Sequence, residues 1–335
     1  MAVKHSNSLK FSCSNSVSEL HAVFLFILDS CNLEEKSCEI LGSVLQLVNS
    51  SLKDLDLSKN DLQDSGTKLL STGLKSRHCK LEILRLSGCM ITEEGCSALT
   101  SALSSNPSHL KELDLTYNHP GDTGVKLLSA RLEDPHCRLE TLRVDYGGEV
   151  RMKPGLKKYS CDVTLDPNTA NTRLSLSEEN RKVVNVEESQ SYPDHPERFD
   201  VWDQFLCRET LTGRCYWEAQ WSGDVYIAVT YKGIRRKGIS YECRLGWNEN
   251  SWILSCSNIR FSVWHNKIIT AVSAPFSQSN RVGVYLDCPA GSLSFYSVST
   301  ETHRLTHLHT FSCSFTEPLY AGFGLYSTGS SVCVR

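Results

Sequence analysis

Long apolar runs are missing from this sequence of 335 residues. The longest, Ala22–Leu28, has seven residues, whereas a membrane-spanning helix needs roughly 18 to 20. Lys4 and Lys10 precede this run as they would in a signal peptide, but no small-residue cleavage site follows it. We therefore predict a protein with no membrane span, and the length corresponds to about two domains.

An excess of basic charge is missing as well. The net charge is -3, and neither half of the chain has more basic than acidic residues. Because nucleic-acid-binding domains usually carry a basic patch, nucleic acid is not expected as the main partner. The one local basic cluster runs from Arg151 to Lys158, and we interpret it as a solvated linker in preference to a binding patch.

Closely paired cysteines are also absent, although the chain has 15 Cys. Their number is odd, and no two are spaced as Cys-x-x-Cys, so we predict reduced thiols in a cytoplasmic protein and no metal site. The phosphate loop Gly-x-x-x-x-Gly-Lys-Ser/Thr does not occur, which argues against a P-loop NTPase. We predict no cofactor.

What the first half does contain is a repeat with a period of 29. Leu52, Leu81, Leu110 and Leu139 are 29 residues apart, and Val23 lies 29 residues before the first of them. Each unit repeats the spacing Leu-x-x-Leu-x-Leu followed by Asn or Cys, and then an apolar pattern at helical spacing. A unit of strand and helix can bury its apolar face only against a neighbour, so the units are expected to stack into an α/β solenoid.

These repeats resemble the ribonuclease-inhibitor type of leucine-rich repeat, with His-Cys pairs at 78–79 and 136–137 just before the next strand. We place them at residues 23–145. Residues 1–22 form an uncertain N-terminal segment that supplies no clear cap. We infer that the chain is either the C-terminal part of a larger receptor or a shortened product of one.

After Val144 the period stops. Residues 146–158 are rich in Gly and are predicted as a linker. Beyond them all six Trp lie within 202–264, and short alternating strands replace the helical spacing. Tyr216–Trp221 and Val225–Tyr231 are predicted as two half-buried strands joined by a tight turn. The second half, 159–335, therefore reads as an all-β sandwich.

Four motifs in this half resemble the PRY-SPRY family: Leu165–Ala170, Trp217–Trp221, Val282–Asp287 and Pro318–Gly324. The fold predicted for the whole chain is thus an α/β leucine-rich-repeat solenoid followed by an all-β PRY-SPRY sandwich. That combination is similar to the C-terminal half of fish NACHT leucine-rich-repeat receptors of innate immunity. The sequence does not contain the NACHT module, so oligomerisation driven by ATP is not carried over.

The resemblance implies a non-enzymatic recognition module of a cytosolic innate-immune receptor that binds protein ligands, either peptide loops or signalling partners. The alternative is a substrate-targeting subunit for a ubiquitin ligase carried on another polypeptide. Intrinsic hydrolysis by Glu218 or Asp287 is a third hypothesis, which we reject because Glu218 points outward from a core strand and no charge partner is predictable.

Ligands of PRY-SPRY domains are implied to bind at variable loops, which correspond here to residues 191–196, 232–237, 247–250 and 264–266. Aromatic and Arg residues often dominate the energy of an interface. The aromatic and Arg candidates also have a structural interpretation: Tyr192 as an ordinary loop residue, the arginines as a solvated turn, and Trp264 as core. The predicted partner-binding residues are Tyr192, Asp194, Arg235, Arg236, Asn248 and Trp264, with no catalytic and no metal residues.

Overall fold

The computed structural model describes residues 24–257, 260–272 and 279–335. The chain divides into two compact units, Met1–Tyr159 and Ser160–Arg335, which are described here one at a time. The predicted N-terminal segment 1–22 and Val23 lie outside the described residues. Within the described ranges, no helix is long and apolar enough to cross a membrane.

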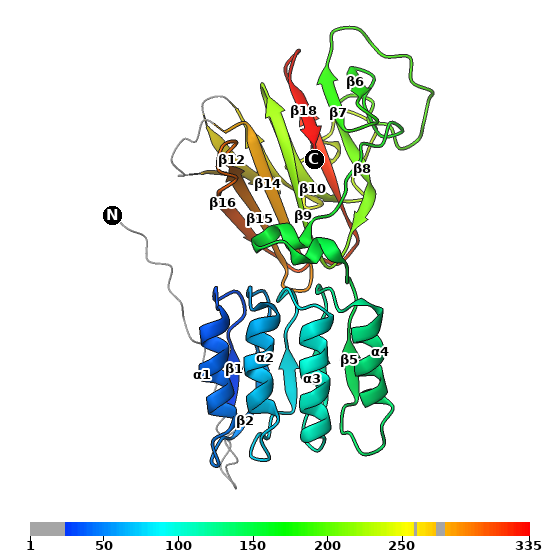
Figure 1. Cartoon of the computed structure of the whole chain (residues 1–335). Coiled ribbons are helices and arrows are strands. Elements are labelled where there is room, and N and C mark those ends of the chain that lie inside the picture. The colour runs from blue at the N-terminus through cyan, green and yellow to red at the C-terminus, as the bar shows by residue number, and fades with distance from the viewer. Residues whose placement is uncertain (1–23, 258–259, 273–278) are drawn as a thin grey trace, which may run out of the picture. The chain divides into compact units, whose positions relative to one another are not determined.

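The first unit is a parallel sheet in the order β1-β2-β3-β4-β5, with four helices lined up along one side of it (Figure 1). Each strand is followed by one helix until the last repeat. The elements are β1 Phe24–Ile27, α1 Glu35–Leu45, β2 Leu52–Asp56, α2 Gln63–Leu74, β3 Ile83–Arg85, α3 Glu93–Ser105, β4 Glu112–Asp114, α4 Gly121–Leu132 and β5 Thr141–Arg143.

The strand pairing follows the period of 29 read from the sequence. Leu55 pairs with Leu84, Leu84 with Leu113, and Leu113 with Leu142. The leucines of the template are buried between the strands and the helices, so each repeat covers the apolar face of its neighbour. The predicted α/β solenoid is confirmed.

Buried asparagines hold the turns that follow the strands. The Asn60 amide donates to the carbonyls of Leu28 and Leu57, at 2.8 Å each, and its oxygen accepts from two backbone N–H groups of the preceding turn. Asn118 makes the same bonds two repeats later. The Cys89 thiol, in the repeat between them, donates to the Leu57 carbonyl at 3.2 Å. The alternation of Asn and Cys therefore satisfies buried backbone groups.

Residues 146–158, predicted as a linker, carry two short 3-10 helices and belong to the first unit. The helices are η1 Glu149–Met152 and η2 Gly155–Tyr159. Lys158, which we expected to be solvated with the rest of the basic cluster, is only 2 % exposed.

The second unit is a sandwich of two antiparallel sheets (Figure 1). One has the order β13-β12-β11-β10-β17-β8 and the other the order β16-β15-β14-β9-β18-β7-β6. The strands are β6 Leu174–Ser177, β7 Lys182–Asn185, β8 Gln204–Leu211, β9 Arg214–Ser222, β10 Val225–Tyr231, β11 Ser251–Cys256, β12 Phe261–His265, β13 Ile268–Ala271, β14 Arg281–Asp287, β15 Ser292–Val298, β16 Leu305–Ser312, β17 Leu319–Leu325 and β18 Ser331–Val334, with the short 3-10 helix η3 at Tyr241–Cys243.

Strands β9 and β10 lie in different sheets although only Gly223 and Asp224 separate them. In β9 the alternation holds, because Trp217, Ala219 and Trp221 face the core between the sheets. The prediction that both strands are half-buried is wrong for β10, since all seven of its residues are buried. A second apolar cluster, which includes Tyr226 and Ala228, covers the outer face of β10.

Candidate protein-interaction site

Three of the four predicted loops meet around one open hollow in the second unit. Its volume is about 470 Å³. Polar side chains dominate its lining, which is the composition expected of a wet protein interface more than of a small-molecule pocket. The lining residues are Gly233, Arg235, Ser240, Tyr241, Glu242, Trp247, Asn248, Glu249, Asn250, Asn266 and Lys267.

Charges of both signs line this hollow. Arg235 and Lys267 are basic, while Glu242 and Glu249 are acidic. Arg235 forms an ion pair of 2.8 Å with Glu242, and the two side chains are 73 % and 58 % exposed. Exposed ion pairs contribute only about 0 to 1 kcal/mol, so a partner can replace this pair at little cost.

Asn248 shapes the hollow from within and is almost fully buried. Its amide donates to the carbonyls of Tyr241 and Arg244, at 3.1 and 2.8 Å. Its side-chain oxygen accepts from the Asn250 N–H at 3.1 Å and the Ser251 hydroxyl at 2.9 Å. Asn248 therefore ties two segments of the hollow together, and little of its side chain is accessible to a ligand.

The segment 238–242, which includes part of η3, was not predicted as part of the site. It contributes Tyr241, which is half exposed and stacks on Trp247 with ring centroids 4.6 Å apart. Ile239 in the same segment is 79 % exposed. The available signal was an aromatic and a large aliphatic residue after a turn glycine, at Gly238-Ile239-Ser240-Tyr241.

Arg244 packs against Trp247 of the stacked pair. Its guanidinium carbon lies 4.6 Å from the ring centroid of Trp202 and 5.1 Å from those of Trp247 and Tyr326. A cation among several aromatic faces is stabilised by their quadrupoles, so Arg244 fixes Trp247 in place.

Trp264 packs beside this cluster on the outer face of the six-stranded sheet. Its ring lies 4.9 Å from Tyr226 and 5.6 Å from Trp247, and its indole N–H donates to the Ser262 hydroxyl at 2.9 Å. Trp264 is half-buried and is not among the residues that line the hollow.

Arg236 differs sharply from its neighbour Arg235. Its guanidinium lies 4.8 Å from the Phe199 ring centroid and donates to the carbonyls of Ile234 and Lys232. Burial lowers the pKa of Arg236. The side chain thus holds its own loop together.

The loop 191–196 contributes no residue to the lining of the hollow. Tyr192 donates its hydroxyl to the Leu174 carbonyl at 2.8 Å, and burial raises its pKa. Asp194 is exposed. The loop does adjoin the site, because Lys237 donates to the His195 carbonyl at 3.3 Å. The structure therefore brings Arg235 and Asn248 together and leaves Tyr192, Asp194, Arg236 and Trp264 around or outside the hollow.

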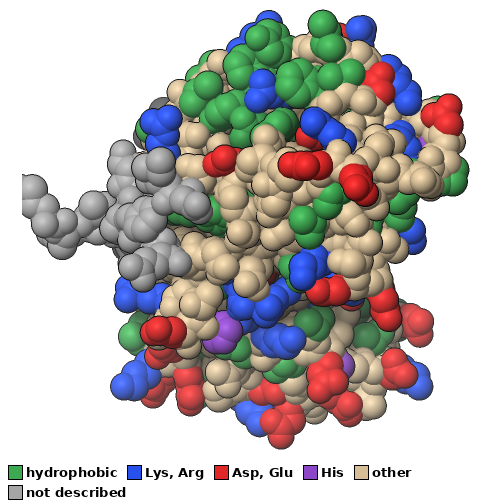
Figure 2. Space-filling view, turned by 90° about the horizontal axis from the view of Figure 1, so that it is seen from above, with side chains coloured by type: hydrophobic (Ala, Val, Ile, Leu, Met, Phe, Trp, Pro, Cys, Tyr) green, Lys and Arg blue, Asp and Glu red, His purple; other side chains and the backbone are tan. Residues whose placement is uncertain are grey.

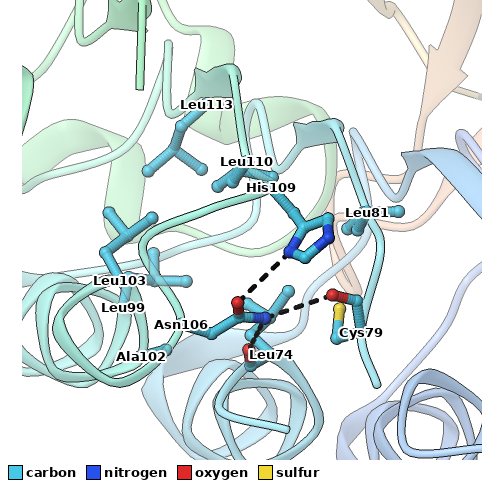
Figure 3. Close-up of a pocket in the computed structure, with 10 residues that line it drawn as sticks. All are labelled: Leu74, Cys79, Leu81, Leu99, Ala102, Leu103, Asn106, His109, Leu110 and Leu113. Atoms are coloured by element: carbon cyan, nitrogen blue, oxygen red, sulfur yellow. Dashed lines mark hydrogen bonds between the residues drawn. The ribbon is translucent and has the colours of Figure 1, made fainter. Parts of the chain in front are cut away.

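A second cavity lies inside the repeats and is lined mainly by leucines (Figure 3). Its volume is only about 10 Å³, barely enough for one water molecule. Asn106 crosses it to donate to the carbonyls of Leu74 and Cys79, at 3.2 Å each, and its oxygen lies 3.3 Å from His109 Nδ1. We interpret this cavity as part of the repeat core.

Burial also controls the reactivity of the thiols in the repeats. Burial raises the pKa of the Cys38 thiol to about 11 and that of Cys89 to about 12, so neither is a ready nucleophile. Within residues 24–257, 260–272 and 279–335, no cluster of three or more His, Cys, Asp or Glu could hold a metal ion. Figure 2 shows one face of the molecule. Apolar side chains gather on one part of that face, with Lys and Arg side chains among them.

Family models match both halves of the chain. The leucine-rich repeat matches residues 48–71, 77–99 and 106–129, the SPRY-associated domain PRY matches 163–211, and the SPRY domain matches 214–335. The chain therefore carries leucine-rich repeats followed by a PRY-SPRY domain, and the predicted fold class is confirmed. Both are protein-interaction modules that are typically non-catalytic.

Individual relatives resemble one part of the chain each. Stonustoxin subunit alpha of Synanceia horrida is 40% identical over 179 residues, which is 53% of this chain and 25% of the relative. Tripartite motif-containing protein 16 of Mus musculus is 40% identical over 181 residues, 53% of this chain and 32% of the relative. Ribonuclease inhibitor of Sus scrofa is 45% identical over 119 residues, 36% of this chain and 26% of the relative.

A solved stonustoxin structure matches with a TM-score of 0.51 at 38% identity, over 54% of this chain and 29% of that chain. The chain spans about a quarter of the length of the stonustoxin subunit that it matches. The activities of these whole relatives are therefore not assigned to it.

Proposed function

We propose that this chain is the non-enzymatic recognition module of an innate-immune receptor of the cytoplasm, and that it binds a protein ligand at the hollow between loops 232–242, 247–250 and 266–267. The observation that carries the proposal is the convergence of three loops, all within residues 232–267, on one polar hollow of about 470 Å³. The strands behind them are buried and fixed by pairing, so these loops are held on a rigid scaffold.

The arrangement suits a peptide loop of a folded partner. The stacked Tyr241 and Trp247 supply a large apolar contact with few rotatable bonds, which is typical of interface anchors. Arg235, Glu242, Glu249 and Lys267 supply charges of both signs around that contact. We therefore expect a ligand with an apolar side chain between one acidic and one basic residue.

The receptor context is the finer part of this proposal. It is supported by the succession of repeats and sandwich, and by the 45% identity to ribonuclease inhibitor over 119 residues. That the same receptor carries a NACHT module is part of this proposal, since the 335 residues do not contain one.

The alternative is that the chain directs a ubiquitin ligase, carried on another polypeptide, to its substrate. The match to tripartite motif-containing protein 16 supports it. In that case the chain would bind two proteins at once, a ligase and a substrate. As a receptor module, by contrast, the chain would need to bind only one protein, its ligand.

A photo-crosslinking amino acid at Glu249, in the full chain, tests the site. Glu249 is exposed and lines the hollow, whereas Glu301 is also an exposed residue of the same unit but does not line it. We expect a defined protein adduct from position 249 and none from position 301. The same adduct from both positions, or from 301 alone, would show that the ligand binds elsewhere.

A further inference from the structure

The segment that joins the repeats to the sandwich is bound to the repeats by a buried charge. Lys158 is 2 % exposed, and its ammonium donates to the Asp61 carboxylate and to the Gly88 carbonyl, at 2.6 Å each. Burying an ammonium is costly unless it is paired and hydrogen-bonded. Here the pairing with Asp61 offsets that cost. Lys158 and Asp61 are 97 residues apart in the sequence, so the ion pair is a specific tertiary contact.

The segment binds where one side chain is missing from a regular row of turn residues. We call this gap, at Gly88, the notch. At one equivalent turn position, 29 residues apart in successive repeats, the residue has a positive φ, and these residues are Ser30, Lys59, Gly88, Tyr117 and Tyr146. Among these five, Gly88 is the one without a side chain. A Cβ at Gly88 would collide with the Tyr159 hydroxyl, so the missing side chain leaves the room that Tyr159 occupies.

Aromatic contacts close the notch on one side. Tyr117 stacks on Tyr146 at 4.7 Å and meets the edge of Tyr159 at 5.3 Å. Arg151 lies 5.4 Å from the Tyr117 ring centroid and donates to the Lys158 carbonyl at 2.6 Å. Both ends of the segment 146–159 therefore contact the same tyrosine.

These contacts differ in kind from those of the solenoid. Repeats bury apolar surface against their nearest neighbours, and that core is complete without Lys158 and Tyr159. The segment instead contacts the turns of successive repeats through one ion pair, a small aromatic stack and a few hydrogen bonds. Among these, the Gly155 N–H donates to the Asp61 carboxylate at 3.3 Å and the Gly148 N–H to the Asn118 carbonyl at 3.1 Å. Such a contact can be lost without removing a residue from the repeat core.

We propose that residues 146–159 form a latch that Lys158 and Tyr159 close on the Gly88 notch, and that the latch can open while the repeats stay folded. When the latch is closed, this segment is held on the repeats. When it is open, the same residues become free tether, with a root-mean-square reach of roughly 20 Å. The latch thus controls how much free chain precedes the PRY-SPRY domain.

Limited digestion with trypsin reads the state of the latch in the full chain. The possible cleavage sites in the segment are Arg151, Lys157 and Lys158, because Lys153 precedes a proline. Asp61→Ala leaves Lys158 buried and unpaired, so we expect cleavage after Lys157 and Lys158 at least tenfold faster than in the wild type. Asp29→Ala is the matched control, since it removes a carboxylate that lies 3.4 Å from the Lys59 ammonium in the same row of turns.

A second variant separates opening of the latch from general damage. In Asp61→Ala/Lys158→Met the unpaired charge is gone while the apolar stem remains, so protection of Lys157 should return to near the wild-type level. Hydrogen exchange in α2 and α3 should be unchanged in all three variants. Unchanged cleavage in Asp61→Ala, no rescue by Lys158→Met, or opening of α2 and α3 together with the segment would each overturn the proposal.

Discussion

Arg235 and Glu242, which both line the hollow, form an ion pair of 2.8 Å, and both remain largely exposed. Their neighbours behave differently: Arg236 and Asn248 are drawn into the protein and hold the loops in position. The site is therefore built from two sets of residues, one that a partner can reach and one that shapes the surface. Each set predicts a different response to mutation.

Truncation of the adjacent residues Arg235 and Arg236 should change the stability of the protein by different amounts. Arg235→Ala should change the free energy of unfolding by no more than about 0.5 kcal/mol, as expected for an exposed residue. Arg236→Ala should cost about 1 to 3 kcal/mol because two carbonyls lose their donor and Phe199 loses its cation contact. Urea unfolding of both variants measures this, and equal stability of the two would contradict the assignment.

Asn248→Ala should destabilise the second unit by about 1 to 3 kcal/mol, because several backbone groups lose a buried partner. Hydrogen exchange should rise at Tyr241–Asn250 before the rest of the sandwich. Glu249→Ala changes the next residue, which is exposed, and serves as the control. It should leave the free energy of unfolding nearly unchanged. A variant of Asn248 with native exchange rates would show that the amide does not organise the loops.

Trp217→Ala should cost about 3 to 5 kcal/mol, the usual range for removing a large buried side chain. Trp217 is 1% exposed and sits in the middle of β9, between β14 and β18. The expected result is loss of exchange protection in the sandwich with the repeats still protected. Trp247→Ala, at a half-buried position, should cost less. Wild-type stability of Trp217→Ala would remove this residue from the core.

The first unit should show a pH dependence that arises at Glu82. Hydrogen bonds from Lys111 and Lys53 hold its pKa at about 2. Because an unfolded Glu titrates near about 4.3, the stabilisation is complete above that pH and is lost as the pH falls toward 2. Glu82→Gln should therefore be less stable than the wild type at pH 6, by about 1 kcal/mol or less per ion pair, and equally stable near pH 2.

Urea unfolding at several pH values measures this difference. Glu140→Gln is the control, since Glu140 is an exposed carboxylate at the corresponding place one repeat beyond Lys111. A Glu82→Gln difference that stays constant from pH 6 to pH 2 would contradict the role of the carboxylate.

The sequence predicted most of the fold because both halves are periodic. A period of 29 fixes the parallel register of Leu55, Leu84 and Leu113, and the alternation in β9 fixes which face carries Trp217. The prediction failed at β10, where only the alternation of Val225, Ile227 and Val229 was considered. Tyr226 and Ala228 between them are apolar too, and such a continuous run is typical of a strand covered on both faces. The sequence also contained no sign that Lys158 is buried, because its partner Asp61 lies in another repeat.

The site was predicted less completely for a similar reason. Loops 232–237, 247–250 and 264–266 were expected to lie at the ligand face, but the inward turn of Arg236 and Asn248 depends on contacts with Phe199 and the Tyr241 carbonyl. Tyr241 itself was missed because no period marks a loop residue. Tyr192 and Asp194 stay a prediction for the rim of the site.

The binding affinity of the partner captured at position 249 tests the central claim most directly. It should be titrated against the full chain, against Arg235→Ala/Glu249→Ala in the hollow, and against Arg304→Ala/Glu301→Ala, a pair of exposed residues outside it. Both double variants leave the net charge unchanged. We predict that the hollow variant binds at least about tenfold more weakly, or about 1.4 kcal/mol, while the control binds like the wild type. Equal affinity of the hollow variant and the wild type would contradict the proposed site.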